Sequence, residues 1–105
     1  MAGTTIACAV AAANTMRVCE VIEFGGPDVL REGRRPWPTA APGEIVVEIA
    51  ATNVNPTDIA ARAGAHRRRM PDLEPPFVAG WDLSGVVSEV NAVNTGFKPG
   101  DRVVG

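Results

Sequence analysis

Residues 44–64 read EIVVEIAATNVNPTDIAARAG, a strand pattern followed directly by a helix pattern. In residues 44–51 apolar side chains recur at every second position, which is typical of a strand with one buried face. That face consists of Ile45, Val47, Ile49 and Ala51. Asn55 then stands at a helix N-cap, Pro56 at the first helical position and Gly64 just beyond the end. The stretch therefore predicts a half-buried strand and then a helix of about two turns.

A helix this short does not persist alone, so it must pack against the rest of the chain, and we expect Ile59 to be its anchor. On both sides of it, short apolar runs alternate with turns rich in proline and glycine. Further strands are expected at residues 16–24, 29–35, 77–90 and 100–105. Five or six short strands with one brief helix are typical of a small barrel or sandwich.

The length and net charge of the chain exclude several classes of function. With 105 residues the chain is at most one ordinary domain. Its 46% hydrophobic and 21% charged residues are typical of a globular protein, and its net charge of −2 provides no positive field for nucleic acid or anionic lipid. No apolar run approaches the roughly 20 residues of a membrane helix. We expect neither nucleic acid nor a membrane among its partners.

The two cysteines, Cys8 and Cys19, form no CxxC pair, and the only histidine is His66. Neither a disulfide framework nor a zinc knuckle is therefore indicated. This use of cysteine suits a reducing, cytoplasmic compartment.

Residues 1–15 contain an apolar run as long as a signal-peptide core, but the first basic residue is Arg17. Because an export signal begins with a positively charged region, we favour a flexible N-terminal extension over a signal peptide. Met16, where the strand pattern starts, is an alternative start of translation.

No self-contained active site is visible in the sequence. It has no glycine-rich phosphate loop, no HExxH helix and no GxSxG nucleophile elbow. Spacing alone does not identify Asp58 and Asp82 as an acid and base pair.

Three segments in order carry a family resemblance. They are ATNVNPTDIAARAG at 51–64, PPFVAGWDLSGVVSEV at 75–90 and GFKPGDRVVG at 96–105. Together they resemble the N-terminal GroES-like domain of the medium-chain dehydrogenase/reductase superfamily, in its zinc-independent quinone oxidoreductase branch. The resemblance runs from Met16 to the last residue. It implies a mainly β fold, a GroES-like partly open barrel of short strands with one or two short helices, over residues 16–105.

The resemblance also bears on metal binding. Zinc-dependent members of the superfamily carry a cysteine where this chain has Asn55 and a histidine where it has Trp81. Zinc is bound by thiolate, imidazole or carboxylate groups, and an amide and an indole are not among them. We therefore expect no catalytic zinc.

The resemblance implies a substrate and cofactor cleft near Asn55, Asp58, Arg62, His66 and Trp81. Asn55 either hydrogen-bonds the cofactor or substrate or only caps its helix. For Asp58 and Arg62 we favour structural roles, as a helix N-terminal charge and its partner four residues on. A solvated loop position is favoured for His66 over proton donation, and packing is favoured for Trp81 over a pocket wall.

Relatives of this kind use NADPH, bound mainly by a Rossmann domain that would follow Gly105 and is absent from these residues. The expected function is the substrate-side domain of an NAD(P)H-dependent reductase. The reductase would transfer hydride from the nicotinamide to a carbonyl-type acceptor such as a quinone or enone, and this fragment alone is expected to be inactive. A homodimer of the full enzyme is compatible with the resemblance. The alternative is a non-catalytic GroES-like module for oligomerisation or partner binding.

Overall fold

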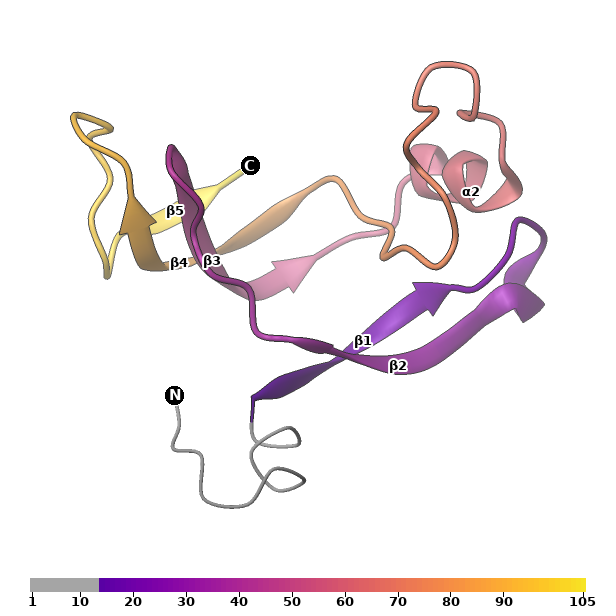
Figure 1. Cartoon of the computed structure of the whole chain (residues 1–105), viewed down its shortest axis with the longest axis horizontal. Helices are drawn as coiled ribbons and strands as arrows, with labels where there is room; N and C mark the ends of the chain where they lie inside the picture. The colour runs from indigo at the N-terminus through magenta and orange to yellow at the C-terminus, as the bar shows by residue number, and fades with distance from the viewer. Residues whose placement is uncertain (1–13) are drawn as a thin grey trace. The chain divides into compact units, whose positions relative to one another are not determined.

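The computed structural model describes residues 14–105. Residues 1–13 of the predicted extension, Cys8 included, lie outside this range, and the first strand begins at Thr15. The chain then runs through strands, one 3-10 helix and one α-helix (Figure 1). In order they are β1 (Thr15–Val21), η1 (Pro27–Val29), β2 (Leu30–Pro36), β3 (Glu44–Thr52), α2 (Pro56–Ala63), β4 (Leu83–Asn91) and β5 (Arg102–Val104).

The strands form two antiparallel sheets, and within the described residues neither sheet closes on itself. β1 pairs with β2, and β3, β4 and β5 make the second sheet in that order. The predicted fold class, mainly β and partly open with short helices, is confirmed. The chain divides into two compact units. The first comprises the residues up to Trp37 with Pro56–Ala79, and the second comprises Pro38–Asn55 with Gly80–Gly105.

The apolar core of the first unit lies where the β1–β2 ribbon ends, at the pair Val21↔Leu30. Val21 exchanges two backbone hydrogen bonds with Phe77, of 2.8 and 3.2 Å, which attach the segment before Ala79 to β1. The rings of Phe24 and Phe77 pack with their centroids 6.1 Å apart. The buried members of this core are Val21, Val29, Ala61 and Phe77.

α2 ends where the sequence predicts. Gly64 has a φ of +87°, which favours glycine. Its amide donates to the Ala61 carbonyl (3.0 Å), and the Ala65 amide donates to the Ala60 carbonyl (2.9 Å). These two bonds form a Schellman motif, the usual way for a glycine to close a helix.

The predicted anchor of α2 is wrong. Ile59 is 48% exposed, whereas Ala61 and Asp58 retain only 2% and 7% of their surface. Residues three apart share one face of a helix, so Asp58 and Ala61 face the core together. Ile59 is about 100° away around the helix axis and faces outward. A small residue and a carboxylate, rather than a large aliphatic one, attach α2 to its unit.

The second unit is the β3–β4–β5 sheet, in which Val87 is the most deeply buried side chain. The pairing of β3 with β4 shifts twice, between Val46 and Val47 and again between Ile49 and Ala51. The extra residue is Ser88 of β4 in the first shift and Ala50 of β3 in the second, so β3 keeps its alternation of faces as far as Ile49. Ile49 is nevertheless 55% exposed, and the predicted half-buried strand is wrong in its second half.

β4 begins at Leu83 rather than at Phe77, where the sequence predicts a strand. Gly80 has a φ of +141°, a conformation outside the strand region, and it separates Phe77 from β4. The last predicted strand is confirmed as β5, which continues its pairing to Gly105 through two hydrogen bonds with Leu83.

Candidate functional site

Three side chains of the second unit form a ring of hydrogen bonds. Asn55 Nδ2 donates to Asp82 Oδ2 at 2.7 Å and to Asn53 Oδ1 at 3.2 Å. Asn53 Nδ2 donates to the same Asp82 oxygen at 3.2 Å. A carboxylate that accepts from two amides makes hydrogen bonds stronger than those between neutral groups. We call Asn53, Asn55 and Asp82 the amide–carboxylate cluster.

The cluster lies where β3 ends and β4 begins, at the ladder pair Thr52↔Leu83. The Thr52 hydroxyl donates to the main-chain carbonyl of Asp82 at 2.6 Å, which fixes the two chain segments against each other. On the β3 side the backbone leaves the ladder after Thr52, and Pro56, which has no N–H to contribute to a strand, begins α2. Two segments that are distant in sequence therefore present their polar side chains at one point.

Asp82 is the charged member of the cluster. The hydrogen bond from Asn55, and next the one from Asn53, hold the pKa of Asp82 below the usual value for an aspartate, against a smaller opposing effect of desolvation. The carboxylate is therefore ionised at neutral pH and acts only as an acceptor. An open hollow adjoins it, lined by Ala51, Thr52, Asn53, Asp82, Leu83 and Ser84.

Two of the predicted cleft residues belong to this unit. Asn55, half-buried, is in the cluster, and Trp81 precedes Asp82 in the chain with 47% of its surface exposed. Sequence reasoning missed Asn53 and Asp82. The available signal was the position of Asp82 in the segment GWD, directly after the position that carries a zinc-binding histidine in zinc-dependent relatives.

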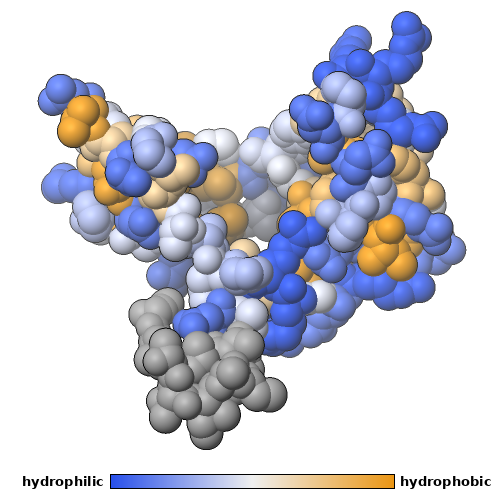
Figure 2. Space-filling view, viewed as in Figure 1, coloured by the Kyte–Doolittle hydropathy of each residue, from blue (hydrophilic) through white to orange (hydrophobic). Residues whose placement is uncertain are grey.

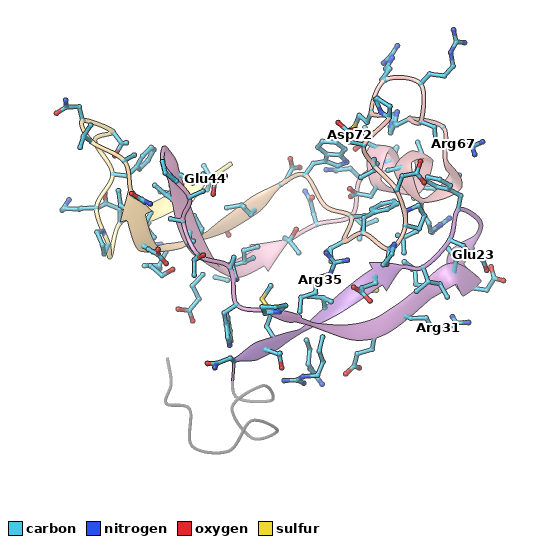
Figure 3. All side chains as sticks on the ribbon, in the orientation of Figure 1. Glu23, Arg31, Arg35, Glu44, Arg67 and Asp72 are labelled. Atoms are coloured by element: carbon cyan, nitrogen blue, oxygen red, sulfur yellow. The ribbon has the colours of Figure 1, made fainter. Side chains whose placement is uncertain are left out.

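The other three predicted residues lie in the first unit. Asp58 is buried on α2, and Arg62 Nε donates to the Gly25 carbonyl at 3.2 Å. His66 is half-buried in the loop after α2, where its carbonyl accepts from two later amides of the same turn. In that loop the Arg67 guanidinium lies 5.1 Å from the centre of the Phe24 ring, beside α2 (Figure 3). These contacts are of the kind that stabilise a fold.

Within residues 14–105, no three His, Cys, Asp or Glu side chains gather closely enough to hold a metal ion. In the same range, no helix has the length and apolar character required to cross a bilayer.

Residues 41–105 match the family described as "Alcohol dehydrogenase GroES-like domain". The chain belongs to this family. Within it, the GroES-like domain is similar to quinone oxidoreductases: it is 36% identical over 89 residues to mouse quinone oxidoreductase, covering 84% of this chain and 26% of the relative. The chain thus spans about a quarter of the length of the curated relatives that it matches.

Solved structures share the fold of this GroES-like domain. The quinone oxidoreductase from Coxiella burnetii superposes with a TM-score of 0.77 at 27% identity, covering 87% of this chain and 29% of the other. A mycobacterial protein solved in complex with NADPH superposes with a TM-score of 0.72 at 37% identity, covering 85% of this chain and 27% of the other. The predicted resemblance to the quinone oxidoreductase branch is confirmed.

Proposed function

We propose that these residues form the substrate-side domain of a zinc-independent, NADPH-dependent oxidoreductase of the cytoplasm. The enzyme would transfer hydride from the nicotinamide to a carbonyl-type acceptor, a quinone or an enone. The observation that supports this most directly is the amide–carboxylate cluster, in which Asn55 stands where zinc-dependent relatives carry a zinc-binding cysteine and Asp82 directly follows the position of their zinc-binding histidine. Mouse quinone oxidoreductase and the NADPH complex among the similar proteins support the choice of acceptor and cofactor.

Zinc independence rests on the donor chemistry at these two positions, which hold Asn55 and Trp81, and in the cluster beside them. Zinc binds thiolate, imidazole and carboxylate groups, and here the cluster supplies two amides and one carboxylate. The single carboxylate, Asp82, already accepts hydrogen bonds from Asn53 and Asn55. We expect metal analysis of the purified enzyme to find no stoichiometric zinc, and activity to survive dialysis against a chelator. Loss of activity that added zinc restores would contradict the proposal.

Asn55 is the residue that we assign to the cofactor or substrate, through a hydrogen bond of its side-chain amide. NADPH, held mainly by a nucleotide-binding domain beyond these residues, supplies the hydride when bound. Asp58 and Arg62 maintain the fold around α2, and contacts of His66 and Trp81 with the substrate stay predictions.

The test is NAD(P)H consumption by the full-length gene product with a panel of quinones and enones. Asn55→Ala should lower kcat/KM by about tenfold, the value of one hydrogen bond to a ligand. Asp101→Asn is the control, because Asp101 is paired with Lys98 and lies outside the cluster. If Asn55→Ala leaves both kcat and KM unaltered, the assignment of Asn55 is wrong. A polypeptide limited to these 105 residues should not oxidise NADPH with any acceptor of the panel and should bind the cofactor weakly.

One observation favours a second candidate, a non-catalytic module for oligomerisation or partner binding. Apolar side chains of the second unit reach the surface (Figure 2), among them Val54, Val93 and Val104, which are 80%, 88% and 84% exposed. Exposed apolar surface of this kind favours association with another protein surface. Sedimentation of the purified protein separates the candidates when combined with the assay. A stable oligomer without cofactor consumption supports the module, and consumption supports the enzyme, in which a homodimer is the expected assembly.

A further inference from the structure

We propose that Asp82 is a positioning residue that fixes which end of the Asn55 side-chain amide faces a ligand, an inference that rests on the proposed role of Asn55. Asp82 itself need not touch cofactor or substrate. It makes one of the two possible orientations of the Asn55 amide unfavourable, although the two are nearly equal in shape.

The two ends of an asparagine amide are similar in size and opposite in hydrogen bonding. Nδ2 donates and Oδ1 accepts, and rotation about the last torsion exchanges them at little steric cost. An ionised carboxylate accepts only, so a flipped Asn55 would place one acceptor against another at the 2.7 Å contact with Asp82 Oδ2. The carboxylate thereby selects the orientation in which Nδ2 faces Asp82.

Asn53 favours the same orientation of the Asn55 amide. Its Oδ1 accepts from Asn55 Nδ2, so the nitrogen, with two hydrogens, faces two acceptors. Asn53 Nδ2 in turn donates to Asp82 Oδ2, which sets the orientation of the Asn53 amide as well. Both contacts of Asn55 Nδ2 would become repulsive if Asn55 were flipped, because its Oδ1 would then face two acceptors.

Asp82, which selects the orientation of the Asn55 amide, is itself held in place by the β3–β4 ladder. Asp82 directly precedes β4, and its main-chain carbonyl accepts from the Thr52 hydroxyl at the last pair of the β3–β4 ladder. Asn55 follows the end of β3 and belongs to no strand. The Asn55 side chain, which lies in a loop, is therefore held in place by a residue that the β3–β4 sheet fixes. Functional side chains need rigid support of this kind.

A double-mutant cycle on the full-length gene product tests the inference. Asn55→Ala and Asp82→Ala should each lower kcat/KM by about tenfold, and the double variant should be no worse than Asn55→Ala, because Asp82 acts through Asn55. Asp82→Asn should also lower kcat/KM, though by less than Asp82→Ala, because its amide can present either a donor or an acceptor to Asn55 and therefore no longer selects one orientation. Additive losses in the double variant, or full activity of Asp82→Ala beside an impaired Asn55→Ala, would overturn the inference and leave the proposed function standing.

A second readout does not depend on activity. In NMR spectra of the 105-residue chain, the two Nδ2 protons of Asn55 should resonate downfield of those of an exposed side-chain amide, and in Asp82→Ala they should move toward the exposed values. If the Asn55 resonances are the same in Asp82→Ala as in the wild type, the inference is overturned. This readout is independent of whether Asn55→Ala is active and therefore of the proposed function. Should Asp82→Ala not fold, Asp82→Ser provides the same comparison with a side chain one atom shorter.

The matched control is Asp101→Asn. Asp101 is another carboxylate of the second unit and is paired with Lys98 at 2.9 Å, so the variant removes the same charge away from the cluster. It should leave both the kinetics and the Asn55 resonances as they are. An equal effect of Asp101→Asn would mean that net charge, rather than orientation of Asn55, is responsible, and would also overturn the inference.

Discussion

Arg62 and Gly25 exchange two hydrogen bonds: the Gly25 amide donates to the Arg62 carbonyl at 3.0 Å, and Arg62 Nε donates to the Gly25 carbonyl at 3.2 Å. The pair joins the last turn of α2 to the turn between β1 and η1. α2 has only eight residues and would not persist without such contacts. Arg62 is thus committed to the fold of the first unit.

We predict that Arg62→Ala lowers the free energy of unfolding by about 1 kcal/mol, because one half-buried hydrogen bond from a charged donor is lost. Urea unfolding followed by circular dichroism measures the change. Arg68→Ala, at an exposed position of the loop after α2, is the control and should behave as the wild type. Equal stabilities of the Arg62→Ala variant and the control would contradict a structural role.

The β1–β2 ribbon contains two arginine–glutamate pairs that differ in burial. Arg35 Nε lies 2.7 Å from Glu20 Oε1, with 37% and 18% of the side chains exposed, and Arg35 Nη2 also donates to the Pro76 carbonyl (Figure 3). The nitrogen and oxygen of Arg17 and Glu32 are 3.9 Å apart, and these side chains are 74% and 70% exposed.

We expect Arg35→Ala to cost about 1 kcal/mol and Arg17→Ala close to nothing, because exposed ion pairs are screened by water while the half-buried one also holds a backbone carbonyl. Thermal unfolding of the two variants at the same ionic strength measures the difference. The pairs are matched in residue type and sheet, so equal shifts in Tm would show that burial does not decide the contribution.

The helix was predictable because its signals are local. Pro56 at the first turn and Gly64 past the end act through their own backbone conformations, and neither depends on the rest of the chain. The turns before β2 and before β3 were predictable for the same reason.

Burial and the cluster were not predictable, because both depend on distant segments. The alternation that predicts a buried Ile49 shows which side chains share a face of the strand, but not whether another segment covers that face, and Ile49 is 55% exposed. Asn55 and Asp82 are 27 positions apart and meet only because Thr52 pairs with Leu83. Sequence spacing carries no information about that pairing, so the sequence does not predict that Asp82 meets Asn55.

At Gly85 the backbones of β4 and β3 leave no room for a side chain. A Cβ atom at this position would overlap the backbone carbonyl of Glu48, which has no flexible end to move away. We predict that Gly85→Ala destabilises the second unit by at least about 2 kcal/mol, at the upper end of the cost of overpacking. Chemical denaturation measures it, with Val86→Ala at a 41% exposed neighbour as the control. A Gly85→Ala variant as stable as its control would contradict the close contact.

Asp82 should also affect stability in acid. Its pKa lies below 3.8 in the folded chain because Asn55 and Asn53 donate to the ionised carboxylate, and unfolding removes both donors. The unfolded chain therefore binds a proton at a higher pH than the folded chain does. The stability that Asp82 contributes is fully present above its unfolded pKa and is lost as the pH falls through the lower folded value.

Asp82→Asn abolishes this linkage, so the unfolding free energy of the variant should fall less steeply than that of the wild type as the pH is lowered from about 5 to about 3. Asp101, whose pKa is also lowered, mainly by its hydrogen bonds with Lys98, contributes in the same direction. Asp101→Asn should flatten the curve independently, and the double variant should be flatter than either. Denaturant-unfolding midpoints of the wild type and the three variants, measured across this pH range, test the prediction. An acid slope of Asp82→Asn equal to that of the wild type would mean that the carboxylate is not held by the two amides in solution, and the positioning of Asn55 would then lack its physical basis.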